Sequence, residues 1–425
     1  MKADALINEI KSGAYDSLLV DIYVDDVVIP YQKGRYVTSI EKFISIYGND
    51  DVEIYSAPGR TEVCGNHTDH QHGEVLAGAI NKDAIAVVKK CNNQVVKIVS
   101  EGYDMITVNL DELEYKDSEK ESTLSLIKGV LYKAKELGYK IGGFQAYITS
   151  DVLIGAGLSS SAAFETVIGT ILSGLYNQMT IDPIVIAQIG QFAENDYFGK
   201  PCGLMDQMAC SVGSLVHINF ANPDKPVVEK VVLDLNKHGY SLCITDTKGS
   251  HADLTADYAA VPEEMKKVAN FFGKETLLGI TLGDIVSQLE QIRSLVGDRA
   301  VLRSIHFVFE NNRVQNAVKA LKDEKVDRFL EEIKTSGNSS YKFLQNVYSS
   351  SDVTHQNVSL ALALSEIFLD GHGVCRVHGG GFAGTIQAFV ENEFVEEYQR
   401  KMNEAFGANS CNILQIRKYG GMKVI

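Results

Sequence analysis

GAGLSSSAAFE, residues 155–165, lies between a β-rich run, FQAYITSDV at 144–152, and an apolar segment of small residues that is typical of a buried helix. The order of strand, glycine turn and helix predicts a loop whose glycines let the backbone approach a ligand closely. Three serine hydroxyls and the free N–H groups of the helix start favour a bound phosphate. The motif is not a Walker loop, because no lysine follows the glycines. A tight turn with a serine N-cap is the structural alternative.

Around this stretch the chain alternates between strand-rich and helix-rich regions. Short β-rich runs separated by turns fill residues 52–110, and apolar residues at helical spacing predict an amphipathic helix over 122–138. Residues 255–348 have a mainly helical pattern. The remaining predictions are a helix at 358–369, a loop at 371–385, a strand at 385–390 and a helix at 393–406. This mixture predicts an α+β protein of two domains, with a short connection near residues 221–226.

Length and charge exclude several classes of protein. The 425 residues are 45% hydrophobic and 22% charged, which suits a globular chain with a sizeable core. A net charge of −15 argues against a nucleic-acid or anionic-membrane surface. The first residues lack the apolar block of a signal peptide and no later run approaches ~20 apolar residues, so a cytoplasmic location is expected. Seven dispersed cysteines without a C-x-x-C pair indicate neither a disulfide framework nor a structural zinc site.

Two further motifs contain residues with catalytic potential. In CGLMDQMAC, residues 202–210, Asp206 stands among apolar residues, as a helix cap, a salt-bridge partner or a general base would. Arg60 follows a β-rich run in APGR, where a guanidinium can meet a phosphate or a carboxylate. The glycine triplet in HGGGFAGT, residues 378–385, is either a flexible loop or a place where backbone passes close to a ligand.

His67, Asp69, His70 and His72 fall within six positions of GNHTDHQHG, residues 65–73. Their spacings are compatible with zinc, but no cysteine or Glu-x-x-His partner accompanies them. Imidazoles and carboxylates that donate and accept in fixed directions also suit a sugar's hydroxyl groups. From these residues alone, a metal site, a sugar-binding loop and a polar turn are all compatible with the sequence.

Together these motifs identify a family resemblance. APGR, GNHTDH, GLSSSAA followed by Glu165, CGLMDQ and GGGFAGT occur in an order and at separations that strongly resemble galactokinases of the GHMP group of small-molecule kinases. The resemblance covers roughly residues 28–420. The HTD loop and CGLMDQ belong to the sugar-kinase branch, which disfavours mevalonate or homoserine as the substrate.

The resemblance implies a fold and an activity. It implies a two-lobed α+β protein with an N-terminal extension at 1–27, a ribosomal S5 domain 2-like lobe at 28–222 and a ferredoxin-like lobe at 223–425. The implied reaction is phosphorylation of a sugar's anomeric hydroxyl by ATP with Mg²⁺, with galactose as the favoured sugar. Its implied partners are the sugar and ATP, and a monomer or weak dimer is expected.

The resemblance also implies roles for particular residues. Asp206 matches the catalytic base and Arg60 the arginine that lies against it. Ser161 and Glu165 match the expected Mg²⁺ ligands. The expected ATP-binding residues are Gly155, Gly157, Leu158, Ser159, Ser160, Ser161 and Ala162. The expected sugar-binding residues are Asn66, His67, Asp69, Gly203 and Tyr258.

The sugar loop departs from the family pattern, which reads close to GRVNLIGEHTDYNGG. Here Glu62 replaces an asparagine and Asn66 replaces a glutamate that in the family binds the C6 hydroxyl. We hypothesise that Asn66 relaxes selection at C6, so galacturonate stays an alternative substrate; a non-catalytic galactose and ATP sensor is a second alternative. Arg376 and His378 precede the glycine triplet, where they either add positive charge near ATP or, for Arg376, pair with an acidic surface.

Overall fold

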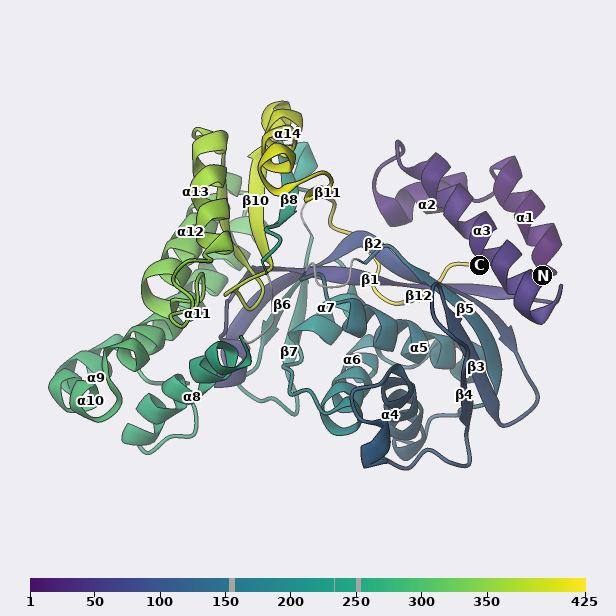
Figure 1. Ribbon diagram of the computed structural model, residues 1–425, viewed down its shortest axis with the longest axis horizontal. Coiled ribbons are helices and arrows are strands. Elements are labelled where there is room, and N and C mark those ends of the chain that lie inside the picture. Colours follow the sequence, from purple (N-terminus) through teal and green to yellow (C-terminus); the bar gives the residue numbers. More distant parts are fainter. Residues whose placement is uncertain (153–156, 233, 250–253) are drawn as a thin grey trace.

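Two antiparallel-rich sheets form the framework of the protein (Figure 1). The structure, a computed structural model, describes residues 1–152, 157–232, 234–249 and 254–425. The larger sheet runs in the order β12-β1-β2-β5-β3-β4; off this path, β6 pairs with β2, and β7 pairs with β6. Its strands are β1 (Glu53–Cys64), β2 (Glu74–Lys90), β3 (Val95–Ser100), β4 (Ile106–Asn109), β5 (Phe144–Ser150), β6 (Leu215–Asn219), β7 (Val227–Val231) and β12 (Met422–Lys423).

The two longest strands of the larger sheet, β1 and β2, form an antiparallel hairpin at its centre. The first part of β2 pairs with β6 and the last part with β5, while β1 pairs along most of its length. Both strands are buried at nearly every position, so the charged side chains that they carry, such as Arg60, Glu62 and Asp83, need partners inside the protein. Register shifts at Pro58/Arg60 and Glu62/Cys64 mark irregularities in β1. Residues 65–73, called the 65–73 loop below, connect the two strands.

Four helices and a π-helical turn pack on one face of this sheet. They are α4 (Thr123–Glu136), α5 (Ser160–Asn177), α6 (Pro183–Phe192), the π turn η3 (Ala193–Phe198) and α7 (Met205–Val212). The predicted strand and helix are confirmed as β5 and α5, and residues 153–156 of the turn between them lie outside the described residues. Contact between α5 and β1 is so close that a Cβ added at Gly174 would lie 2.2 Å from the Tyr55 hydroxyl. This contact packs the C-terminal part of α5 tightly against β1.

Three N-terminal helices cover the opposite face (Figure 1). They are α1 (Ala3–Ser12), α2 (Asp16–Tyr23) and α3 (Ile29–Tyr47). Leu6, Ile10 and Ile22 are at most 1% exposed and share one apolar cluster with sheet residues such as Ile54 and Ile85. Residues 1–27, expected as an extension, are therefore part of a packed layer.

A buried carboxylate ties this layer to the sheet. Asp83 on β2 is fully buried and accepts hydrogen bonds from Tyr23 (3.0 Å), Arg35 (2.7 Å) and Arg417 (2.8 Å). Burial opposes ionisation of this carboxyl, but the two guanidinium charges outweigh it and hold the pKa of Asp83 below its usual value. One acidic side chain thus joins α2, α3, β2 and a C-terminal segment.

The smaller sheet and its helices form the second part. Its strands follow the order β11-β8-β10-β9, all antiparallel. They are β8 (Tyr240–Asp246), β9 (Gly373–His378), β10 (Thr385–Glu391) and β11 (Cys411–Leu414). The helices are α8 (Thr255–Phe271), α9 (Leu282–Ser287), α10 (Leu289–Val296), α11 (Asp298–Lys322), α12 (Val326–Ser339), α13 (Asn357–Leu369) and α14 (Val395–Phe406), with a π turn, η5 (Ser340–Leu344). No helix in the described ranges is long and apolar enough to cross a membrane.

The structure corrects one sequence prediction and qualifies another. The predicted loop 371–385 contains β9, whose pattern was masked by a charged residue, Arg376, that is buried in the strand. Two strands beyond residue 222, β7 and β12, belong to the larger sheet. The division into lobes at 28–222 and 223–425 stays a prediction and does not describe membership of the sheets.

We expect the substitution Asp83→Asn to cost about 3–5 kcal/mol of folding free energy, because two buried guanidinium groups lose their countercharge. A carboxyl with a lowered pKa in the folded state stabilises above its unfolded pKa of about 3.9 and loses that contribution as pH falls. The difference between variant and wild type should therefore shrink under acid. Chemical denaturation at pH 7 and below pH 4 measures it, with the exposed Asp104→Asn as the control. Equal stability of Asp83→Asn and wild type at pH 7 would contradict this account.

Candidate active site

Arg60 and Asp206 form a bidentate ion pair between β1 and the first turn of α7. Arg60 Nε donates to Asp206 Oδ1 at 2.7 Å and Nη2 donates to Oδ2 at 2.9 Å. Arg60 also donates to the Gly157 carbonyl, and the Ser159 hydroxyl donates to the Asp206 carboxylate. The structure thus brings the predicted base, the predicted arginine and the serine loop (residues 157–162) together.

Both members of this pair are ionised at neutral pH. Burial opposes the charge of Asp206, but the Arg60 guanidinium and the hydrogen bonds from Arg60 and Ser159 lower its pKa below the usual value. Burial likewise opposes the charge of Arg60, and attraction to Asp206 raises its pKa. Asp206 is therefore a carboxylate, the form that can accept a proton.

The serine loop begins α5 as the sequence predicted. Gly155 lies outside the described residues. Gly157 has a φ of +65° and a Cβ there would lie 2.8 Å from the Thr385 hydroxyl, so only glycine fits. Ser159 is the N-cap residue, with a φ of +58°. Leu158 is buried, and Ser160, Ser161 and Ala162 open α5, where first-turn N–H groups lack intrahelical partners and favour an anion.

The oxygen of Ser161 has a different acidic neighbour from the one predicted. Ser161 Oγ donates to Glu194 Oε1 at 3.2 Å, and Lys200 Nζ lies 3.0 Å from the same oxygen. Glu165 is 1% exposed and accepts from Gln207 at 3.1 Å. Burial and the nearby Glu194 raise the pKa of Glu165 well above its usual value, which favours a neutral carboxyl.

Glu194 is a candidate site residue that sequence reasoning missed. Gln207 Nε2 links it to Glu165, at 2.8 Å from Glu194 Oε2. Its signal in the sequence is modest: it is the first charged residue after Asp182, at the end of an otherwise uncharged helical run. No group of three or more His, Cys, Asp or Glu side chains in the described ranges could hold a metal by itself.

Asp69 of the 65–73 loop lies against Gly203, which precedes α7. A Cβ added at Gly203 would lie 2.1 Å from Asp69 Oδ2, so any larger residue would displace this carboxylate. Burial raises the pKa of Asp69. Because Gly203 is three residues from Asp206, the contact sets Asp69 near the predicted base.

The side chain of His67, in the 65–73 loop, contacts the glycine loop (residues 379–384). His67 Nε2 lies 2.9 Å from the Gly380 carbonyl and therefore carries the proton, while Nδ1 lies 3.2 Å from His70 Nε2. Burial, with His67 and His306 nearby, lowers the pKa of His70 to about 3. His70 is thus a neutral imidazole that orients His67.

Tyr258 on α8 contacts the same glycine loop. Its hydroxyl donates to the Gly381 carbonyl at 2.7 Å, and its ring meets Phe382 edge to face. A Cβ at Gly380 would lie 2.6 Å from the Tyr258 ring. Burial raises the pKa of Tyr258 to about 12. The predicted sugar-binding tyrosine is therefore beside the loop that His67 touches.

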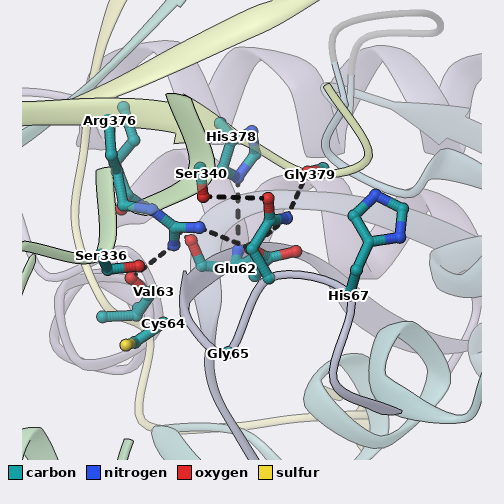
Figure 2. Close-up of polar contacts among 12 residues, drawn as sticks. Glu62, Val63, Cys64, Gly65, His67, Ser336, Ser340, Arg376, His378 and Gly379 are labelled. Carbon is teal, nitrogen blue, oxygen red and sulfur yellow. Dashed lines mark hydrogen bonds and ion pairs between the residues drawn. The ribbon is translucent and has the colours of Figure 1, made fainter. Parts of the chain in front are cut away.

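Asn66 is placed differently from the sequence hypothesis. Its side chain is fully buried, and both its amide nitrogen and its amide oxygen hydrogen bond to protein atoms. A side chain so placed is enclosed by the protein, which argues against direct contact with the C6 substituent of a sugar. Figure 2 shows Glu62, Ser340, Arg376 and Gly379 gathered near Gly65, at the start of the 65–73 loop.

Neither Arg376 nor His378 behaves as the sequence suggested. Arg376 is fully buried and donates to Glu62 at 2.9 Å and to the Val63 carbonyl at 2.7 Å, so it pairs with an interior carboxylate and not with an acidic surface (Figure 2). His378 Nε2 accepts from the Glu62 N–H, and Nδ1 then donates to the Thr385 hydroxyl. Burial, with Arg60 and Arg376 nearby, lowers the pKa of His378 far below its usual value. It is neutral and adds no charge to the serine loop.

Comparisons with known proteins agree with this geometry. Residues 41–90, which include the 65–73 loop, match the galactokinase galactose-binding signature, and residues 125–214 match the GHMP kinases N-terminal domain. A galactokinase of Streptomyces coelicolor is 28% identical over 370 residues, covering 87% of this chain and 92% of the relative. A Clostridium tetani galactokinase is 26% identical over 382 residues, covering 89% and 94%.

Solved structures of GHMP kinases are also similar to this chain. A crystal structure of Lactococcus lactis galactokinase complexed with galactose superposes with a TM-score of 0.77 at 25% identity, covering 90% of this chain and 98% of that one. Methanococcus jannaschii mevalonate kinase, at 15% identity and a TM-score of 0.61, shares the fold. With its α+β architecture, its two matched family models and relatives along most of its length, the chain belongs to the galactokinase family of the GHMP kinases.

Proposed function

We propose that the protein transfers the γ-phosphoryl group of ATP to the anomeric hydroxyl of galactose. The observation that carries the proposal is the Arg60–Asp206 pair, which lies between the serine loop and the 65–73 loop. The galactose-binding signature over residues 41–90 and the likeness to a galactose-bound galactokinase support this sugar. The protein is then a phosphotransferase with an alcohol group as acceptor.

Phosphoryl transfer demands in-line positioning and charge neutralisation more than covalent chemistry. Asp206 accepts the proton of the attacking hydroxyl, for which its ionised state suits it. Arg60 holds the Asp206 carboxylate in one orientation through two hydrogen bonds and supplies positive charge beside the transferring group. The first-turn N–H groups of α5 bind phosphate oxygens.

Mg²⁺ fits the oxygens of Ser161 and Glu194 better than the predicted pair of Ser161 and Glu165. Mg²⁺ prefers oxygen ligands and is held by one or two carboxylates together with the substrate's phosphates. Glu194 is the carboxylate that lies within hydrogen-bonding distance of Ser161, whereas Glu165 is linked to Glu194 only through Gln207. When bound, the ion neutralises charge on the phosphates.

The alternative functions lack a supporting observation. The enclosed Asn66 removes the argument for a uronic acid at C6, and an intact Arg60, Asp206 and serine loop disfavour a sensor without turnover. The expected cytoplasmic location and the monomer or weak dimer stay predictions.

Turnover tests the proposal directly. ADP release with MgATP should be rapid with galactose and slow with galacturonate, arabinose, glucose and N-acetylgalactosamine. Asp206→Asn removes the proton acceptor and should fold and bind ATP while kcat falls by a factor of about 10²–10⁴, the usual contribution of a positioned base. A preference for galacturonate would refute the choice of sugar, and full activity of Asp206→Asn would refute its role.

The two carboxylates near Ser161 are separable by their dependence on Mg²⁺. Glu194→Gln removes the anionic oxygen beside Ser161, so we expect the Mg²⁺ concentration for half-maximal rate to rise by about tenfold or more, corresponding to about 1.4 kcal/mol. Glu165→Gln keeps a neutral group of the same shape and should change it by less than about twofold. Titrating MgCl₂ at fixed ATP measures both, and the reverse ranking would restore Glu165 as the ligand.

Gly203→Ala tests the placement of Asp69. The added Cβ would displace Asp69 Oδ2, from which it is only 2.1 Å away. A displacement of about 1 Å in a substrate-positioning group can lower rates by about 10²-fold, so kcat/KM for galactose should fall on this scale. The KM for ATP and the melting temperature serve as internal controls. An unchanged KM for galactose would remove Asp69 from the sugar site.

A further inference from the structure

Two positions that depart from the family pattern, Glu62 and Asn66, have exchanged their residue types. The family pattern has an asparagine where this chain has Glu62 and a glutamate where it has Asn66. In the structure these two side chains touch, since Asn66 Nδ2 donates to Glu62 Oε1 at 2.9 Å. A carboxylate and an amide are therefore in contact, with the negative charge on β1 instead of in the loop.

The negative charge of Glu62 is balanced by the positive charge of Arg376. It is 3% exposed, and the fully buried Arg376 of β9 donates to the same Oε1 at 2.9 Å. Arg376 also donates to the Val63 carbonyl. A buried ion pair holds its geometry only if both partners remain, because removing one leaves an uncompensated charge.

Asn66 joins four segments of the chain. Its Nδ2 also donates to the Gly379 carbonyl at 2.7 Å, and its Oδ1 accepts from Asn346 at 2.7 Å and from Ser340 at 3.3 Å. Its backbone carbonyl accepts from His306 of α11 at 2.9 Å. The amide is thus satisfied by β1, the glycine loop and the segment after α12.

His67, the residue after Asn66, connects the buried Asn66 contacts to the candidate active site. His67 has a φ of +58° and touches the Gly380 carbonyl, the neighbour of the carbonyl that Asn66 touches. Two consecutive residues of the 65–73 loop therefore contact two consecutive residues of the glycine loop. A shift of Asn66 cannot leave His67 in place.

We propose that Glu62, Asn66 and Arg376 act as one positioning unit, which sets the 65–73 loop and the glycine loop relative to each other and so governs the affinity for galactose without touching it. The proposal rests on the proposed function. It replaces the hypothesis that Asn66 reads the C6 substituent.

Asn66→Asp tests the unit. The new carboxylate has no N–H groups to donate and faces two acceptors, Glu62 Oε1 and the Gly379 carbonyl. We expect the KM for galactose to rise about 10- to 100-fold and the KM for MgATP to stay within about twofold. The exposed Asn222→Asp makes the same chemical change elsewhere and should match wild type.

The double variant Glu62→Gln/Asn66→Asp restores the pair with the roles exchanged and the same net charge as wild type. We expect it to recover at least half of the loss in log KM. A double variant no better than Asn66→Asp, or an unchanged KM in Asn66→Asp, would overturn the proposal. If Asn66→Asp is recovered unfolded, Asn346→Ala removes a donor to Asn66 instead and should raise the same KM.

Hydrogen–deuterium exchange of residues 65–73 and 379–384 supplies a readout that needs no turnover. Exchange should accelerate in Asn66→Asp and return toward wild type in the double variant, and no acceleration would contradict the unit. A wild-type protein without galactose kinase activity would refute the proposed function, while the exchange data would still decide whether the three residues hold the two loops together.

Discussion

The antiparallel ladder between β1 and β2 is the constraint on which the site depends. Arg60 and Glu62 lie on β1, and the 65–73 loop joins the two strands. Helices on both faces bury the ladder, so neither strand can shift without disrupting two apolar clusters. The interruptions of the ladder flank Arg60 and Glu62, which lets β1 turn these two side chains toward α7 and β9. A rigid strand with local irregularities therefore delivers both charged contacts.

Charge in the centre is arranged in separated pairs. Arg60 meets Asp206, Arg376 meets Glu62, and the neutral His378 lies between the two arginines, donating nothing to either carboxylate. Because each guanidinium has its own acceptor, the net charge of the two pairs is zero before substrate binds. Phosphate is then attracted by helix N–H groups and by Arg60, which donates to the Gly157 carbonyl of the serine loop.

Local motifs could be predicted from the sequence, and long-range contacts could not. The strand, turn and helix around the serine loop, and the meeting of Arg60 with Asp206, follow from short patterns and their resemblance to a family. Glu194 was missed because its neighbour Ser161 is 33 positions away, and no spacing rule links a helix start to a π turn. β9 was missed because Arg376 resembles a surface residue until its partner Glu62, 314 positions away, is known. The burial of Asn66 could not be predicted, since it depends on segments near residues 306, 340 and 379.

The buried contacts of Asp83 also bear on how the chain folds. Asp83 pairs with Arg35, 48 positions away, and with Arg417, 334 positions away. Closing so long a loop costs entropy before the contact is made, so we expect the sheet interior around Asp83 to be completed late. Until Arg417 docks, Asp83 lacks one of its two countercharges, and we expect a sheet left in this state to be prone to aggregation. The ion pair that stabilises the finished molecule is thus also one that we expect to form late in its assembly.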